Sequence, residues 1–158
     1  MSLHANVACN CFERGLLRTP PPGHVAVGED GFLAPAVSDE HTIRCFDEWL
    51  RANPCEHPQQ AAASVRLGNV ATIGSIRQAL EAEANRFPIL LGKVVYSGSH
   101  TGDWLTPPEV LALNAELESI AVSSSGMSAE MRSVMEGFAF PLREVCKAAL
   151  QMKKPVRF

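Results

Sequence analysis

The sequence has no long apolar run, which argues against a membrane protein. Its longest apolar stretches, such as residues 88–91, are far shorter than the about 20 residues that a membrane-spanning helix needs. The N-terminus also lacks a charged start followed by an apolar stretch, which is the pattern of a secretory signal. We therefore expect a cytoplasmic protein without a membrane partner.

Basic residues are few, and no basic surface is evident from the sequence. The 14 lysines and arginines stand against 17 acidic residues, for a net charge of −3, and they are scattered apart from Lys153, Lys154 and Arg157. Nucleic-acid-binding domains usually concentrate basic residues in a stripe, often with interleaved aromatic residues. Nucleic acid is therefore disfavoured as a partner, whereas a protein partner stays open. The oligomeric state is undetermined.

The sequence also lacks the even cysteine count that is typical of a disulfide-bonded framework. It has five cysteines and no export signal, so we expect them to be reduced. In a reducing compartment, closely spaced cysteines are more often metal ligands or redox groups. Neither an internal repeat nor a glycine loop that binds phosphate is present. With 158 residues, the chain has the length of one domain, and we assign residues 1–158 to it.

The N-terminal part predicts a strand and a hairpin. Residues 3–12 mix strand-forming residues with alanine, and on a strand Cys9 and Cys11 would share one face. A proline-rich break follows. Residues 25–27 and 32–33 then flank a turn with two glycines, which predicts a short hairpin.

A first helix is expected over residues 38–52. Ile43, Phe46 and Leu50 recur at helical spacing and predict its buried face. Asn53 precedes a proline, and the residue before a proline avoids helical geometry. The helix should therefore end there.

Helical and extended patterns alternate in the rest of the chain. We predict strands at residues 64–67, 89–96 and 155–158, the last of them at a sheet edge, and helices at residues 73–87, 106–120 and 128–149. Thr106 and Glu109 form a capping box, and Ser128 is a cap for the last helix. Pro141 should kink or split that helix. The pattern predicts an α+β fold, with about four helices packed on a short mixed sheet; a small irregular α/β fold is the alternative.

Two short cysteine-containing pairs carry the clearest chemistry. Cys9 and Cys11 are separated by one residue, as are Cys55 and His57. Together they offer three thiolates and one imidazole, the ligand number and type of a tetrahedral zinc site. Four protein ligands leave no position for water, so the zinc would be structural. We predict a zinc-binding domain that acts through protein–protein contacts rather than as an enzyme.

Other interpretations of these residues stay open. Cys9 and Cys11 could instead be small buried side chains, with His57 at the surface, and a redox pair is the less favoured alternative. A zinc-dependent hydrolase would need an open metal position, with Glu56 as the general base. A small acidic bacterial domain also suits a toxin-neutralising immunity protein.

Further candidate residues are less specific. His41 and Cys45 share a helix face and could supply alternative ligands, but an exposed pair is favoured. Cys146 lies on an apolar helix face and is expected in the core. One glycine-containing loop combines residues that could line a pocket, namely His100, Asp103 and Trp104.

These motifs resemble an uncharacterised family of small bacterial proteins. The similarity lies in Cys9-Asn10-Cys11-Phe12, in Cys55-Glu56-His57 and in Leu67-Gly68-Asn69. It also includes the ending Leu142 to Phe158, which closes in Lys154-Pro155-Val156-Arg157-Phe158. The resemblance spans most of the chain. It implies a bacterial cytosolic protein, and it supplies no activity, substrate or site.

Overall fold

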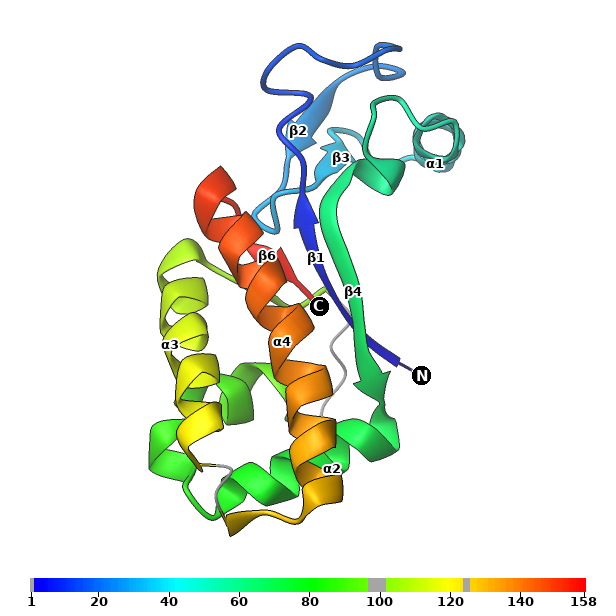
Figure 1. Cartoon of the computed structure of the whole chain (residues 1–158). Coiled ribbons are helices and arrows are strands. Elements are labelled where there is room, and N and C mark those ends of the chain that lie inside the picture. Colours follow the sequence, from blue (N-terminus) through cyan, green and yellow to red (C-terminus); the bar gives the residue numbers. More distant parts are fainter. Residues whose placement is uncertain (1, 97–101, 124–125) are drawn as a thin grey trace.

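The computed structural model describes residues 2–96, 102–123 and 126–158. Within these residues, the main sheet has four strands, β1 (Ser2–Ala8), β4 (Ala61–Asn69), β5 (Trp104–Leu105) and β6 (Val156–Arg157), in the order β4-β1-β6-β5 (Figure 1). A separate hairpin pairs β2 (Val25–Val27) with β3 (Leu33–Pro35). Every pairing in both sheets is antiparallel, so the expectation of a mixed sheet is wrong.

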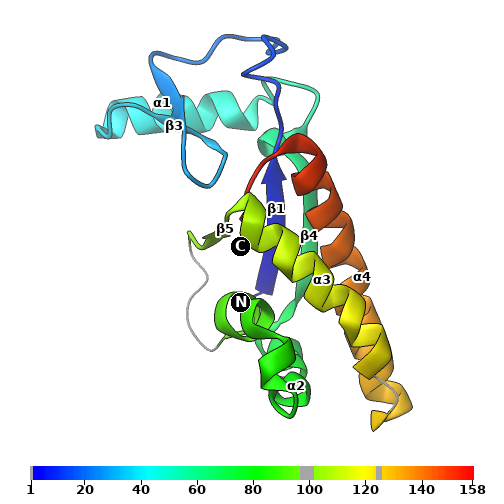
Figure 2. The ribbon, with the colours of Figure 1, turned by 90° about the vertical axis from the view of Figure 1, so that its left-hand side faces the viewer.

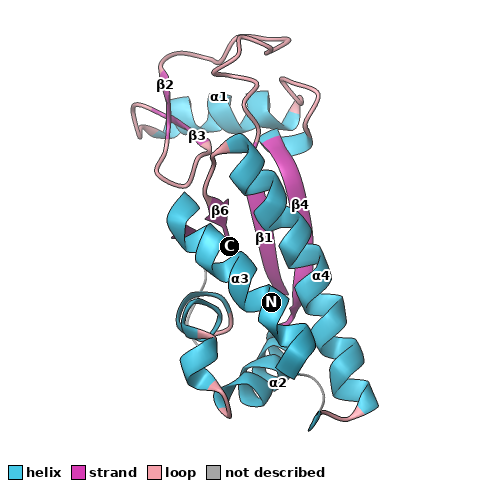
Figure 3. Ribbon diagram, turned by 60° about the vertical axis from the view of Figure 1, so that its left-hand side comes forward, coloured by secondary structure: helices cyan, strands magenta, loops and turns pink. Residues whose placement is uncertain are grey.

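The α-helices of the described residues are α1 (Glu40–Arg51), α2 (Val70–Glu81), α3 (Pro107–Ser123) and α4 (Ala129–Met152), which confirms the α+β class. Short 3-10 turns at Pro58–Gln60 and Ala84–Arg86 and a π-helical turn at Leu90–Val94 complete the helical elements. Figure 3 shows α3 and α4 lying over β1 and β4. In Figures 1 and 2, α1 and the hairpin lie beyond one end of the sheet, and α2 lies beyond the other. None of the described helices combines the length and the apolar character needed to cross a membrane.

The sheet has one buried and one polar face. Successive strand residues point to opposite faces, and in β1 Leu3, Ala5 and Val7 belong to the main core with α2, α3 and α4. The alternate residue Asn6 lies on the other face, opposite Ser64 of β4 and Arg157 of β6. The helices therefore cover one face only, and the second face presents polar side chains.

Helix α1 buries Phe46 as predicted, but the rest of its buried face is shifted from the predicted one. Phe46 and Trp49 are buried, whereas Ile43 is 41% exposed. The reason is that α1 lies beyond the sheet and packs on the loop before the hairpin, where the Trp49 Nε1 donates to the Thr19 carbonyl at 3.2 Å. The apolar spacing predicts the helix correctly, but the surface against which it packs is not evident from the sequence.

The strand expected at residues 89–96 is wrong, because Leu90–Val94 forms a π-helical turn. The backbone N–H groups at the start of this turn donate hydrogen bonds to a residue that is distant in the sequence. The Glu116 carboxylate of α3 accepts hydrogen bonds from the backbone N–H groups of Ile89 and Leu90, both at 2.8 Å. Such a carboxylate is a favourable cap for a helical N-terminus. Glu116 is buried, and this burial raises the pKa of its carboxyl group.

We expect Glu116→Ala to destabilise the fold by about 2 kcal/mol, since it leaves one buried and one half-buried donor unsatisfied. Glu116→Gln is the matched variant, because it keeps one acceptor oxygen at the same place and should cost less. Urea unfolding monitored by circular dichroism measures both values. Equal stability of the alanine variant and the wild type would show that this cap does not hold the turn.

The C-terminal part differs from its prediction in two respects. Residues 155–158 were expected at a sheet edge, but β6 lies between β1 and β5. Helix α4 runs from Ala129 to Met152 without a split at Pro141, although a proline there has no N–H to donate to the Gly137 carbonyl. The predicted caps are confirmed: Thr106 donates to Glu109 through its N–H and hydroxyl groups, both at 2.8 Å, and the Ser128 hydroxyl accepts from the Met131 N–H at 3.2 Å.

Candidate metal centre

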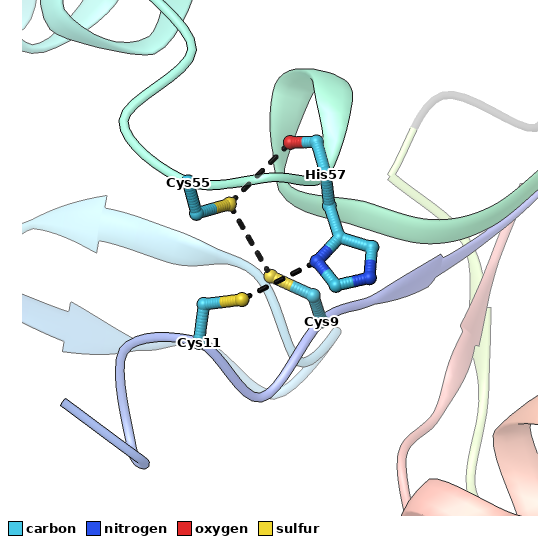
Figure 4. A group of neighbouring side chains, drawn as sticks. All are labelled: Cys9, Cys11, Cys55 and His57. Atoms are coloured by element: carbon cyan, nitrogen blue, oxygen red, sulfur yellow. Dashed lines mark hydrogen bonds between the residues drawn. The ribbon is translucent and has the colours of Figure 1, made fainter. Parts of the chain in front are cut away.

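The register of β1 and β4 brings the two ligand pairs together. Ala8, the last residue of β1, pairs with Ala61, the first residue of β4. Beyond this pair, the Cys9 N–H donates to the Gln60 carbonyl at 2.7 Å. Because the strands are antiparallel, the residues that follow β1 lie beside those that precede β4. Figure 4 shows the side chains from these two segments converging.

The candidate ligand atoms form one compact group. The three sulfurs and one ring nitrogen of Cys9, Cys11, Cys55 and His57, called the cysteine–histidine cluster below, lie within 4.8 Å of one another. The Cys9 and Cys55 sulfurs are 3.8 Å apart, and the Cys11 sulfur is 3.3 Å from the His57 Nδ1 (Figure 4). The sequence therefore identified the residues that meet, although Cys9 and Cys11 follow the strand rather than lying on its face.

These distances match the edges of a tetrahedral zinc site. With a zinc–sulfur distance of about 2.3 Å, two thiolates at tetrahedral positions are about 3.8 Å apart, and a thiolate and an imidazole nitrogen are slightly closer. The observed sulfur–sulfur distance of 3.8 Å and sulfur–nitrogen distance of 3.3 Å are close to these values. These two separations, with all four ligand atoms within 4.8 Å of one another, are compatible with metal binding.

Turns and hydrogen bonds on both sides fix the two segments. After β1 the chain turns back over Cys11, whose carbonyl accepts from the Leu16 N–H at 2.7 Å. The Arg18 N–H then donates to the Pro54 carbonyl at 2.7 Å, which ties this turn to the end of α1. Helix α1 ends at Arg51, close to the predicted end at residue 52, and Asn53 beyond its cap has a positive φ of 52°, which is typical of the chain after a helix.

The thiols lie in their own buried cluster, apart from the main core. Cys9, Cys11 and Cys55 are 7%, 3% and 1% exposed, with Leu17, Ala62 and Met152 packed around them. Burial raises the pKa of the Cys9 thiol and raises the pKa of Cys11 to about 12. Reactive cysteines have lowered pKa values, so this environment does not favour the redox-pair interpretation. A metal ion binding here would have to displace the thiol protons.

Glu56 does not enter the cluster. Its side chain is 69% exposed, and its Oε1 lies 3.9 Å from the His57 Nδ1. The cavities that the described residues form around Arg51 and Arg157 and around Tyr96 include none of the four cluster side chains. A substrate bound in any of these cavities would therefore not be lined by a cluster side chain.

The other candidate residues lie elsewhere. His41 and Cys45 are neighbours on α1, with Nε2 and Sγ 3.7 Å apart, and no third ligand among the described residues joins them. Cys146 is fully buried in the core, and burial raises its pKa to about 12. His100 lies outside the described residues, whereas the Asp103 carboxylate accepts from the Tyr96 hydroxyl.

One residue next to the cluster was not predicted. Gln60 is 4% exposed, and its side-chain Nε2 finds no hydrogen-bond partner among the residues that the structure describes. Its φ of 60° is also left-handed. No spacing rule singles out a glutamine. Only its place three residues after His57 could have drawn attention to it.

Comparison with known proteins adds no relative to this description. No family model, curated protein or solved structure matches the chain. The fold and the site therefore define the molecule by themselves: an α+β chain with a buried group of three cysteines and one histidine that is compatible with metal binding.

Proposed function

We propose that this chain is a zinc-binding domain in which the metal is structural and the domain works through contacts with another protein. Cys9, Cys11, Cys55 and His57 hold the ion. The ion joins the segment after β1 to the segment before β4. Cys9 and Cys55, one ligand from each segment, are 46 positions apart in the sequence.

A single observation carries the proposal, namely the convergence of four suitable ligand atoms within 4.8 Å. Three thiolates and one imidazole form a common structural zinc set. Buried cysteines alone would account for the packing, but they would not account for an imidazole nitrogen placed 3.3 Å from a thiol at the same point. The ligand chemistry favours zinc over a hard cation such as magnesium, because thiolates are soft ligands.

The arrangement supports a structural role rather than hydrolysis. A catalytic zinc keeps one position open for water, whereas this cluster supplies four protein ligands. The exposed Glu56 carboxylate reaches the ligating nitrogen of His57 no closer than 3.9 Å, and no cavity described above adjoins the ligands. These two observations favour a structural metal over a zinc hydrolase.

The part of the chain that the metal would hold in place also carries exposed apolar side chains. Four large ones lie between the two ligand pairs, at 40–58% exposure: Leu16, Val27, Val37 and Ile43. Scattered exposed apolar residues are ordinary, but several near one ordered lobe suit a contact surface for a protein. This observation supports the protein-contact part of the proposal.

Elemental analysis of protein purified without added metal tests the proposal. We expect about one zinc per chain, because four ligands of this type bind one tetrahedral ion. Absorption spectroscopy after cobalt substitution should then show the intense visible bands of a tetrahedral thiolate site. Metal-free protein that also fails to bind added zinc would refute the assignment.

A further inference from the structure

A cavity lies between the end of α1 and the polar face of the main sheet, and its charge is distinctive. It has a volume of about 400 Å³ and includes Arg51 of α1 and Arg157 of β6, with no carboxylate in its lining. The whole chain carries a net charge of −3. Two arginines without an acidic residue are therefore a local exception to the charge of the protein.

The polar residues of this cavity offer mainly hydrogen-bond donors. The Ser64 hydroxyl donates to the Asn6 Oδ1 at 2.7 Å, so the Asn6 side chain turns its acceptor to Ser64 and keeps its amide N–H groups for other partners. Asn53 and Gln59 add two further amides to the lining. Donors and positive charge together are the features that recognise an oxyanion.

The two arginines differ in how they are held. The Arg157 guanidinium lies 3.7 Å from the centre of the Phe32 ring, and its Nη1 donates to the Asp30 Oδ2 at 3.1 Å. A guanidinium has five N–H donors, so this ion pair leaves most of them available. Arg51 is exposed, and no carboxylate among the described residues pairs with it. One arginine is thus fixed in advance, and the other is free to close on a ligand.

A second cavity of about 320 Å³ continues the first, since Phe32, Arg51, Gln59 and Arg157 line both. Gln60 also lines this second cavity, and its buried side-chain Nε2 has no hydrogen-bond partner among the described residues. Asp47 is the one acidic residue among its lining residues. The two cavities form one groove, and Arg51 and Arg157 line both parts of it.

The backbone along this groove is unusual as well. Among the described residues, four that are not glycine have a positive φ, and three of them line the groove: Asn53, Gln59 and Gln60, at 52°, 51° and 60°. Left-handed geometry is unfavourable for such residues and tends to concentrate at functional sites.

We propose that this groove binds a small anionic ligand through its phosphate or carboxylate oxygens, held between Arg51 and Arg157. The amides of Asn6 and Gln59 add hydrogen bonds. The assignment goes beyond the proposed zinc-binding function, because no cluster side chain lines the groove.

Titration of the full chain at low ionic strength, followed by NMR of the backbone amides, tests this assignment. One arm uses inorganic phosphate and the other uses succinate, so that the arm that saturates identifies the oxyanion. We expect saturable binding in at least one arm, with shifts in the Asn53, Gln59 and Arg157 amides. Absence of saturation in both arms would overturn the proposal.

Arg51→Gln is the decisive variant, because Arg51 is exposed and its loss should not change the fold. It should weaken binding about tenfold, since a charge-assisted hydrogen bond contributes on that order. Arg132→Gln removes the same charge from the start of α4, at the opposite end of the molecule in Figure 1, and should change affinity less than about twofold because distant charges are screened. Equal weakening by the two variants would show only general charge attraction and would overturn the site.

Discussion

Replacing Cys55 by serine should reduce the zinc content from about one ion per chain to a small fraction and should lower the thermal midpoint by about 10 °C or more. Cys55 is the most buried of the three cluster thiols, at 1% exposure, and its sulfur lies 3.8 Å from that of Cys9. A serine hydroxyl is a poor zinc ligand, and three remaining ligands bind more weakly. Elemental analysis and differential scanning calorimetry measure the two effects.

The loss of stability follows from the coupling of metal binding to folding. Structural zinc binds to the folded arrangement of ligands, so its binding free energy becomes part of the folding free energy. Beyond the β1–β4 ladder, the described residues also tie these two segments through the Cys9–Gln60 and Arg18–Pro54 backbone hydrogen bonds.

Cys45→Ser is the matched control. Cys45 is a half-buried cysteine of α1 outside the cluster, and its nearest polar partner is the His41 ring. The substitution changes the same atoms, so any general effect of losing a thiol should appear in both variants. Zinc content should stay at the wild-type value. If Cys55→Ser kept its zinc, or if both variants lost it equally, the ligand assignment would be wrong.

The ligand residues could be predicted because their chemistry is local and specific. Thiolates and imidazoles are strong metal ligands, and two closely spaced pairs contain the correct number of them. That they meet depends on a long-range pairing, since the antiparallel register places Ala8 opposite Ala61. The sequence predicted both strands approximately but did not predict that they pair. The convergence was therefore a hypothesis until the structure placed both segments at one end of the sheet.

The segment at residues 89–96 shows why part of the fold was not predictable. Its apolar, partly β-branched composition is compatible with a buried strand or with a buried helical turn, since a short apolar run does not distinguish them. The helical turn is stabilised by Glu116, whose carboxylate accepts hydrogen bonds from the N–H groups of Ile89 and Leu90, 27 and 26 positions earlier in the sequence. No local pattern contains that contact.

The groove illustrates the same limit for a binding site. Its two arginines, Arg51 of α1 and Arg157 of β6, are far apart in the sequence. Neither belongs to a spacing pattern that indicates a binding site. β6 was expected at a sheet edge, yet it lies in the interior of the sheet beside β1. Only this position brings Arg157 opposite Asn6 and next to the end of α1. A site assembled from single residues of separate elements leaves no motif.

Removal of zinc with a strong chelator should loosen one end of the molecule and leave the helical core intact. The cluster thiols pack in a group separate from the main core, which centres on residues such as Phe138, Leu142 and Leu113. Local stability can differ widely between such units. The metal-free protein should therefore keep its helical circular dichroism while the segments around the cluster open more often.

Hydrogen exchange with mass spectrometry measures this difference. The amides of Cys9, Leu16 and Arg18, which donate to backbone carbonyls at 2.7 Å around the cluster, should exchange about 100-fold faster without zinc, since each tenfold step is about 1.4 kcal/mol of opening free energy. Amides in the middle of α4 should keep their protection. Chelator treatment of Cys55→Ser should add nothing, because that variant has already lost the ion. Uniform acceleration across α4 would instead mean that the metal stabilises the whole fold, and unchanged exchange near Cys9 would mean that it holds neither segment.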